Sequence, residues 1–336
     1  MKKLQKLRLP ENYQLSEDDI NQTIQFDAFL NHLTDVSNSE PIYPIGIKSI
    51  GVTNQKATVT IESIESPHTY IPLLCEISTG VNLKGKRGIH TSRCIESIFT
   101  LSQRKFKTLD DFSYELACEV RKRQEADSAF AQVSGTYLQK QQTKKTNLET
   151  HDPIQLISKA SVTEKKSFII TGMKVSSVTA CPCTKTYTKY STVPELKNMG
   201  LDTDQINRIL GIFASGTHMQ RGDTTLMVDK GNSTITYKDI YTVLDQSVHL
   251  VNELLKRPDE HDLVIRALKK PQFVEDLVRE VMFNAYQSFC GKLSSEATLS
   301  VESILFDSIH SHDVHALITS TLGEIRADLE QGNNEA

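Results

Sequence analysis

The sequence predicts an α+β protein built from a duplicated module. Three observations lead to this prediction. Runs of residues that alternate with period two occur in both halves of the chain, and amphipathic runs with a four-residue period follow them. A His-x-x-Arg sequence stands once in each half, at 90–93 and 218–221, each time near strand patterns. We therefore expect two similar units in tandem, each combining strands and helices.

The chain has 336 residues, and we expect four segments in it. Residues 1–40 are polar with scattered apolar positions, which predicts an irregular N-terminal arm. The first module is expected at 41–165 and the second at 166–325, and the second holds most of the candidate metal ligands. Residues 326–336 form an acidic tail.

Alternation predicts strands in the first module at 45–52, 56–62, 71–77 and 130–137. A helix is expected at 108–123, because apolar residues recur there every four positions and Thr108 can form a capping box with Asp111. The polar run at 139–145 predicts a hairpin or a linker.

In the second module, strands are expected at 167–177, 224–228 and 296–307. Two amphipathic helices are expected at 237–256 and 272–288. Residues 186–215 have no counterpart in the first module, and a short capped helix is expected within them at 201–210. The segment after Leu317 is expected to be helical.

Composition limits the classes of function. Hydrophobic residues make up 38% and charged residues 24%, as in globular proteins with a core. The net charge of -4 gives no reason to expect a nucleic-acid partner, which would require a basic stripe. No apolar run approaches the roughly 18–20 residues that cross a bilayer, and the basic start lacks the apolar core of a signal peptide. We expect a cytoplasmic protein that does not bind membranes, with its six cysteines as reduced thiols.

Cys181 and Cys183 flank Pro182, with polar residues after them. With one residue between them, both sulfur atoms can reach one metal only under strain. We therefore expect one metal ligand and one supporting neighbour. The pattern also allows a nucleophile or two structural cysteines in a turn, because the reactivity of a thiolate depends on its surroundings.

Three later segments contain further metal-binding residue types. His218 comes just before a strand pattern, and Glu260 follows a proline that is expected to end a helix. His310 and His312 share a face if the strand through Leu305 continues. Thiolate, imidazole and carboxylate together form the ligand set of zinc or ferrous iron. Taken singly, none of these residues is specific for a metal, and a solvated surface group is the more common role for His218 and for Glu260.

Five segments, taken in order, resemble the signature blocks of type IB GTP cyclohydrolase I, and the resemblance covers residues 40–320. They are 179–183, 218–222, 255–260, 273–279 and 308–312, with 86–93 as a further similar segment in the first module. The resemblance implies two tandem tunnelling-fold modules, each an antiparallel sheet with helices packed on one face. It also implies a homotetramer with active sites between subunits.

The same resemblance implies roles for individual residues. The implied metal ligands are Cys181, His218, Glu260 and His310. The implied catalytic and supporting groups are Cys181, His312 and Cys183. Glu275 would bind guanine through N1–H and the 2-amino group. The candidates for the triphosphate are Arg221, His90, Arg93 and Lys185. One divalent metal is implied per site, with Fe(II) favoured and Mn(II) or Zn(II) as alternatives.

The implied reaction opens GTP at C8, releases formate and closes a pterin ring, as the first step of folate or methanopterin biosynthesis. A metal would lower the pKa of a water molecule for this hydrolysis. Cys181 and His218 stand 37 positions apart, whereas the two blocks nearly adjoin in the compact bacterial form. The longer layout resembles the archaeal ferrous-iron enzymes of the methanopterin pathway. The expected product is therefore either 7,8-dihydroneopterin triphosphate or its 2′,3′-cyclic phosphate.

Two alternatives remain open from the sequence. One is a nitrile reductase of the same tunnelling-fold superfamily, which would use a cysteine nucleophile and NADPH. The other is a non-catalytic purine-binding protein.

Overall fold

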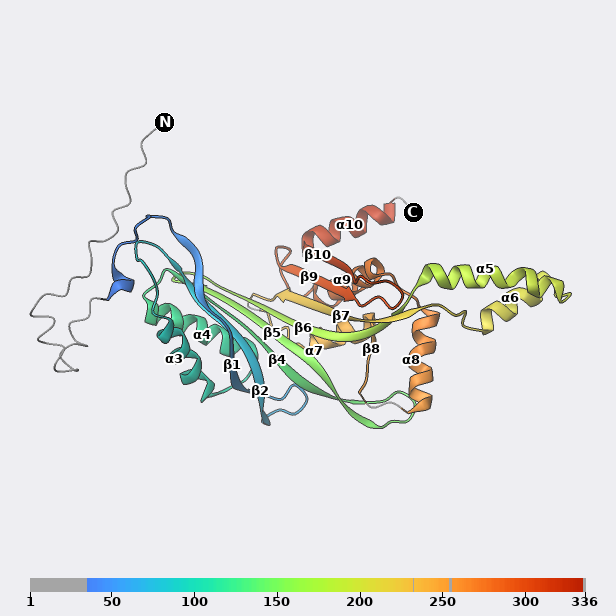
Figure 1. Ribbon diagram of the computed structural model, residues 1–336, viewed down its shortest axis with the longest axis horizontal. Coiled ribbons are helices and arrows are strands. Elements are labelled where there is room, and N and C mark those ends of the chain that lie inside the picture. The colour runs from blue at the N-terminus through green and yellow to red at the C-terminus, as the bar shows by residue number, and fades with distance from the viewer. Residues whose placement is uncertain (1–34, 232, 254–255, 335–336) are drawn as a thin grey trace, which may run out of the picture. The chain divides into compact units, whose positions relative to one another are not determined.

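The structure is a computed structural model that describes residues 35–231, 233–253 and 256–334. It confirms the α+β class (Figure 1). Ten strands form one sheet in the order β10-β9-β7-β6-β5-β4-β2-β1-β3, and β8 pairs with β6. The chain divides into a small unit, described at 35–46 and 83–89, and a larger unit that holds the sheet.

The small unit contains the 3-10 turn η1 (Val36–Asn38). The backbone N–H of Arg87 donates to the carbonyl of Ser39 at 2.8 Å, and that of Gly88 donates to Ser37 at 3.1 Å. Most of the expected N-terminal arm, residues 1–34, lies outside the described residues.

The larger unit repeats one topology, in which two strands, a helical segment and two more strands follow each other. The first repeat contains β1 (Ile47–Glu62), β2 (Tyr70–Leu83), α3 (Thr91–Ser102), β3 (Lys105–Phe106), α4 (Leu109–Gln124), β4 (Ser128–Gln142) and β5 (Glu149–Thr163). The second contains β6 (Ser167–Ala180), α5 (Pro182–Asn198), α6 (Thr203–Ile212), β7 (Met219–Asp229), α7 (Tyr237–Ser247), β8 (His249–Leu250), α8 (Arg257–Lys269), α9 (Val274–Phe289), β9 (Thr298–Leu305), β10 (Val314–Thr321) and α10 (Leu322–Asn334). The duplication inferred from the sequence is thus present in the topology.

The core lies between the sheet and the helices that pack on it. α4 packs on β4 and β5, and α9 packs on β9 and β10. The predicted capping box is confirmed, because Thr108 Oγ1 accepts from Asp111 N while Asp111 accepts from Thr108 N. In the part of the chain that the structure describes, no helix is long and apolar enough to cross a membrane.

The two strands expected at 45–52 and 56–62 are one strand, β1. The polar residues between them suggested a break. Instead, Asn54 adopts a left-handed φ of 57° within the strand, a conformation that asparagine tolerates better than most residues. The strand therefore continues through the polar segment.

β5, for which no strand was predicted, lies between β4 and β6 in the sheet. Pro153 lies within it and argued against a strand, because proline cannot donate to a ladder. In the structure, β5 pairs with β6 only from Gln155 to Val162. Pro153 lies opposite Leu138 in the ladder with β4 but outside the ladder with β6, so it has a paired strand on one side only.

The helix expected at 237–256 is wrong beyond Ser247. The chain turns at Val248, and β8 pairs with Ser177 and Val178 of β6. β6 extends past the end of the β5 ladder at Lys174, which leaves backbone groups open on that side. β8 pairs with this free edge and satisfies its backbone groups. The apolar residues that suggested a longer helix therefore belong to a strand.

Two further predictions are corrected. Pro258 does not end a helix; it lies in the first turn of α8, where its missing N–H is tolerated. The segment after Leu317 continues as β10 to Thr321 and becomes helical only in α10.

A buried ion pair joins the two repeats. Asp110 of α4 accepts from Lys230 Nζ at 2.5 Å, from Thr171 Oγ1 at 2.7 Å and from Tyr237 Oη at 3.0 Å. The side chains of Asp110 and Lys230 are 3% and 16% exposed. The Asp110 carboxylate thus links a helix of the first repeat to β6, α7 and the loop after β7. Burial raises the pKa of Tyr237, and the negative charge of Asp110 adds to this effect, so Tyr237 stays protonated as a donor.

We expect Asp110→Ala to lower the free energy of unfolding by about 3–5 kcal/mol, because it leaves the Lys230 ammonium buried without its partner. Urea unfolding followed by circular dichroism measures this change. The control is Lys292→Ala, which breaks a more exposed pair with Asp239 and should cost only about 0–1 kcal/mol. Equal losses in the two variants would show that the buried pair does not couple the repeats.

Candidate functional site

The ends of β6 and β7 bring two candidate ligands together. The ladder between these strands ends with Ala180 opposite Met219. One step further, the backbone N–H of Cys181 donates to the carbonyl of His218 at 3.1 Å, and Thr217 Oγ1 donates to the Cys181 carbonyl at 2.9 Å. Residues 37 positions apart in the sequence are therefore neighbours.

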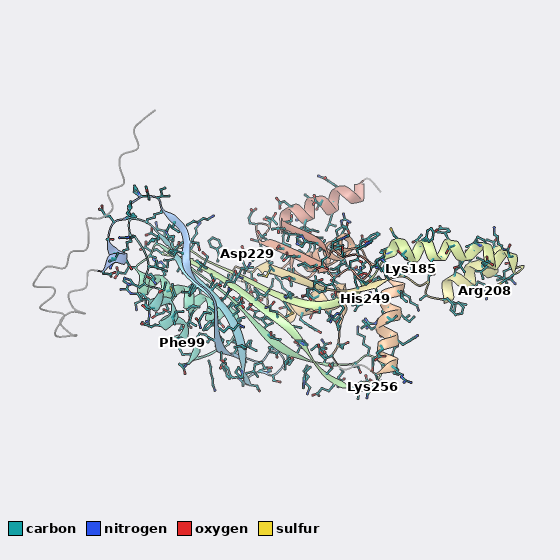
Figure 2. All side chains as sticks on the ribbon, viewed as in Figure 1. Phe99, Lys185, Arg208, Asp229, His249 and Lys256 are labelled. Atoms are coloured by element: carbon teal, nitrogen blue, oxygen red, sulfur yellow. The ribbon has the colours of Figure 1, made fainter. Side chains whose placement is uncertain are left out.

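The segment between these two residues is a helical hairpin, α5 and α6, which we call the α5–α6 hairpin (Figure 1). The predicted short helix is confirmed as α6, where Asp202 and Gln205 form a capping box. Cys181 is the N-cap of α5 and Cys183 lies in its first turn. Figure 2 shows Lys185 at the base of the hairpin. Burial lowers the pKa of Lys185, and the positive charge of Lys189 adds to this effect.

His310 and His312 lie in the loop between β9 and β10, residues 306–313, which we call the His310 loop. The strand ends at Leu305, so the expected continuation of a strand through both histidines is wrong. Their rings nevertheless stack, with centroids 5.2 Å apart and an angle of 11° between the planes. They share a face through this stacking and not through strand alternation.

Asp307 holds the backbone of the His310 loop. Hydrogen bonds from the backbone N–H groups of Ile309 and His310, at 2.8 and 3.0 Å, lower the pKa of Asp307, and the charges of His310 and His218 lower it further. Phe306 N also donates to the carbonyl of Arg221 at 2.9 Å. The His310 loop therefore begins beside Arg221, three positions along the chain from His218.

The Nδ1 atom of His218 is buried and has no hydrogen-bond partner within the described chain. A buried imidazole nitrogen without a partner is costly unless something else binds it. However, no group of three His, Cys, Asp or Glu side chains in the described residues lies close enough to hold a metal ion.

Glu275 lies in the first turn of α9 and is exposed. Thr179 Oγ1, near the end of β6, donates to the carbonyl of Gln272 at 2.8 Å. This buried contact fixes the start of α9 to the strand that leads into Cys181. The structure thereby brings the candidate guanine-binding helix to the same strand end.

Glu260 is exposed in the first turn of α8, and no contact links it to Cys181. Its neighbour Asp259 binds the turn between β4 and β5, accepting from Lys145 N, Thr146 N and Thr146 Oγ1. Burial alone would raise the pKa of Asp259, but these hydrogen bonds outweigh it and bring the value to about 2. The structure therefore holds the beginning of α8 at that turn.

His90 and Arg93 lie at the start of α3. Arg93 Nη1 donates to the carbonyl of Arg123 at 2.8 Å, and Gln124 Nε2 donates to that of His90 at 2.7 Å. These bonds hold the start of α3 against the end of α4. They do not bring either residue to Cys181.

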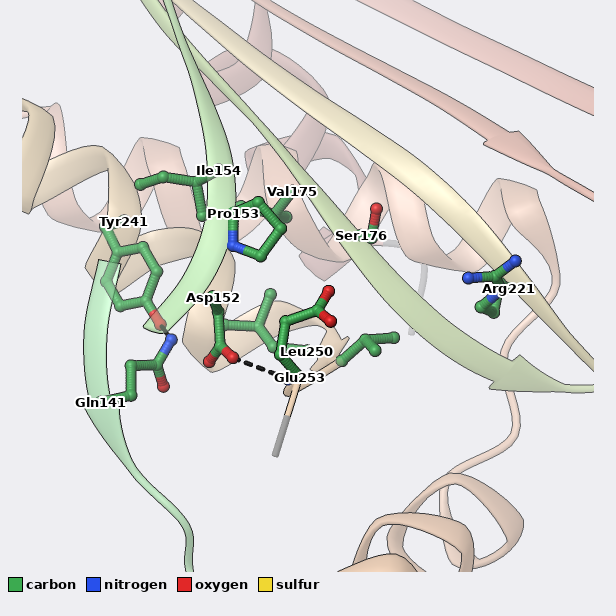
Figure 3. Close-up of a pocket in the computed structure, with 11 residues that line it drawn as sticks. Gln141, Asp152, Pro153, Ile154, Val175, Ser176, Arg221, Tyr241, Leu250 and Glu253 are labelled. Carbon is green, nitrogen blue, oxygen red and sulfur yellow. Dashed lines mark hydrogen bonds between the residues drawn. The ribbon is translucent and has the colours of Figure 1, made fainter. Parts of the chain in front are cut away.

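Arg221 lines a pocket that the sequence analysis missed (Figure 3). Other lining residues are Gln141, Asp152, Ser176, Tyr241 and Glu253. Asp152 is 3% exposed and accepts from Asn252 Nδ2 at 2.7 Å and from Glu253 N at 2.8 Å. The pocket depends on β5, so no local sequence pattern could have revealed it. The carboxylates of Asp152 and Glu253 would repel a triphosphate inside the pocket. Arg221 could therefore contact a phosphate only at the rim of the pocket.

A model of the family described as type I GTP cyclohydrolase folE2 matches residues 33–316. The chain belongs to this family. It is thus an enzyme of the type IB GTP cyclohydrolase I group, as the ordered blocks predicted.

Two relatives named GTP cyclohydrolase agree with this membership. GTP cyclohydrolase MptA of Methanococcus maripaludis strain C6 is 30% identical over 314 residues, which cover 89% of this chain and 99% of that protein. GTP cyclohydrolase MptA 1 of Methanocella arvoryzae is 30% identical over 308 residues, covering 88% and 96%. Among solved structures, uricase from Arthrobacter globiformis aligns with a TM-score of 0.45 at 7% identity, over 82% of this chain and 94% of that one.

The donors in this region suit a metal of the kind that the family resemblance implies. A half-buried thiol and an imidazole stand on adjacent strand ends, and the imidazole has a buried nitrogen without a partner. Sulfur and nitrogen donors together suit borderline-soft divalent ions such as Fe(II) or Zn(II). A carboxylate would complete this donor set, and among the described residues no hydrogen bond or ion pair joins the exposed Glu260 to Cys181 or His218.

His249 of β8 offers a test of the packing beside this region. Burial lowers the pKa of His249 below its usual 6.5, and the charges of Arg266 and Lys270 add to this, while a hydrogen bond to the Lys270 carbonyl opposes it. The unfolded chain therefore binds a proton at a pH where the folded chain does not. The contribution of neutral His249 to the free energy of unfolding is fully present above about pH 6.5 and is lost as the pH falls below that value.

We expect the melting temperature of the wild-type protein to fall more than that of His249→Gln between about pH 7.5 and 5.5. Differential scanning calorimetry at several pH values measures the two slopes. His68→Gln, at a side chain that is 98% exposed, serves as the control and should keep the wild-type slope. Identical slopes for all three proteins would contradict the assignment to His249.

Proposed function

We propose that this chain is a metal-dependent GTP cyclohydrolase, which hydrolyses GTP at C8, releases formate and forms a pterin. The observation that carries the proposal is the meeting of Cys181 and His218 at the ends of β6 and β7, with the His310 loop beside them. Family membership and the names of the relatives support GTP as the substrate. We propose the cytoplasm as its location.

Within this proposal, Cys181, His218 and His310 hold a divalent cation, Fe(II) in the first instance, and Glu260 completes the set. A cation bound there would act as a Lewis acid and lower the pKa of a water molecule. Glu275 accepts hydrogen bonds from N1–H and the 2-amino group of guanine, a pattern that adenine lacks. His312, stacked on His310, supplies a proton to the nitrogen that is released when the ring opens, and Cys183 supports Cys181.

The triphosphate would be bound by Lys185 at the base of α5 and by Arg221 at the pocket rim. His90 and Arg93 are held at the start of α3, away from these residues. We propose that they come from another subunit of a homotetramer, so that the sites lie between subunits. We propose the 2′,3′-cyclic phosphate as the product, because the 37-position spacing of Cys181 and His218 resembles the layout of the archaeal methanopterin-pathway enzymes.

Anaerobic turnover of GTP with Fe(II), Mn(II) or Zn(II), with products identified by mass, tests the proposal. We expect formate release and a pterin product with at least one metal, and no turnover after chelation. Cys181→Ala should lower kcat/KM by more than about 100-fold, since losing a ligand costs more than losing its outer partner. The control Cys290→Ala, at an exposed thiol beyond α9, should retain wild-type activity. Turnover that survives chelation, or an active Cys181→Ala protein, would exclude this function.

Glu275→Gln tests guanine recognition. We expect kcat/KM for GTP to fall about 10–100-fold, because hydrogen bonds to a charged acceptor contribute roughly 1.5–3 kcal/mol. Inosine triphosphate lacks the 2-amino group, so the preference for GTP over it should shrink in the variant. Steady-state kinetics with both nucleotides gives the comparison, with Asp328→Asn on α10 as control. An unchanged preference would remove Glu275 from the guanine site.

A further inference from the structure

The α5–α6 hairpin carries a large uncovered apolar surface. Five large apolar side chains on it are 70–76% exposed: Tyr187, Tyr190, Met199, Ile212 and Phe213. Large side chains of this kind carry roughly 150–250 Å² each when aromatic, so these five expose on the order of 500 Å². Apolar surface of this extent typically marks an interaction site. It is too small to hold a dimer alone, so it would extend a larger interface.

The His310 loop has the complementary character. Phe306 and Ile309 are 42% and 60% exposed, and Asp307 and Asp313 give the loop two negative charges. The helix α5 is basic, with Lys185, Lys189 and Lys197 against the single acid Glu195. Apolar residues thus alternate with opposite charges on the two surfaces. Such complementarity orients an interface and selects its partner.

Within one chain, the α5–α6 hairpin and the His310 loop do not cover each other's apolar residues. Tyr190 is 71% exposed and Ile309 is 60% exposed, although both belong to elements that start beside Cys181 and His218. The hydrogen bonds of Cys181 with His218 and Thr217 fix both ends of the hairpin. Within the described chain, Tyr190 and Ile309 therefore both remain open to a second copy.

We propose that the α5–α6 hairpin of one copy docks on the His310 loop of a second copy and covers that copy's candidate site. Tyr187 and Tyr190 lie three positions apart on α5, and with Phe213 they pack on Phe306 and Ile309 of the partner. The part concerning the site rests on the proposed function, whereas the docking contact is tested without catalysis.

The contact is tested with the photo-crosslinking amino acid p-benzoylphenylalanine in place of Tyr190 in the full chain. We expect irradiation to give a dimer on a denaturing gel, in which position 190 is joined to residues 306–313. The same amino acid at Phe99 of α3, which is 51% exposed, should not reach residues 306–313. A crosslink within one chain, a crosslink to another region, or no crosslink at position 190 would overturn the proposal.

Mixed subunits test the covering of the site. One variant, Cys181→Ala, has an intact hairpin, and the other, Tyr187→Ser/Tyr190→Ser, has intact candidate ligands. Each alone should be impaired, whereas co-expression in equal amounts should restore about one quarter of wild-type activity, since half of the sites keep Cys181 and half of these meet an intact hairpin. No gain in the mixture overturns the docking in trans. An active Cys181→Ala protein would instead refute the proposed function and leave the crosslink result valid.

Discussion

The antiparallel pairing of β6 with β7 is the interaction on which the candidate site depends. The ladder runs along the whole of β7 and ends where Cys181 N–H meets the His218 carbonyl. Because both flanking strands are fixed by their own hydrogen bonds, the chain between them can be long without moving its ends. The α5–α6 hairpin is such an insertion, so it separates the two residues in sequence and not in space.

The length of β6 also determines what gathers around this strand end. β6 extends beyond the β5 ladder, and β8 pairs with the edge that is left open. The Thr179 hydroxyl near the end of β6 fixes the segment before α9. β7, β8 and the segment before α9, all in the second repeat, therefore meet this one strand. The buried Asp110–Lys230 pair secures the same strand to the first repeat through Thr171.

Local patterns predicted the elements that local forces determine. The capping box at Thr108 and the helical period after it identified α4, and Asp202 with Gln205 identified α6. β8 escaped prediction because it depends on the free edge of another strand. β5 escaped prediction because it contains Pro153, and proline is unusual in a strand with two neighbours. The order of the candidate ligand blocks indicated the family, which the comparison then confirmed. The pocket of Asp152 and Tyr241 had no local signal at all.

The sequence by itself determined the residue types available for the chemistry, the order of the blocks, the duplication and the helices with strong caps. All of these depend on residues within a few positions of each other or on order along the chain. Only the tertiary structure decided that Cys181 meets His218, that the His310 loop lies beside them, and that Asp259 binds the beginning of α8 to the β4–β5 turn. Strand register and free sheet edges arise from pairing between distant segments, and this pairing also leaves the aromatic residues of the α5–α6 hairpin exposed.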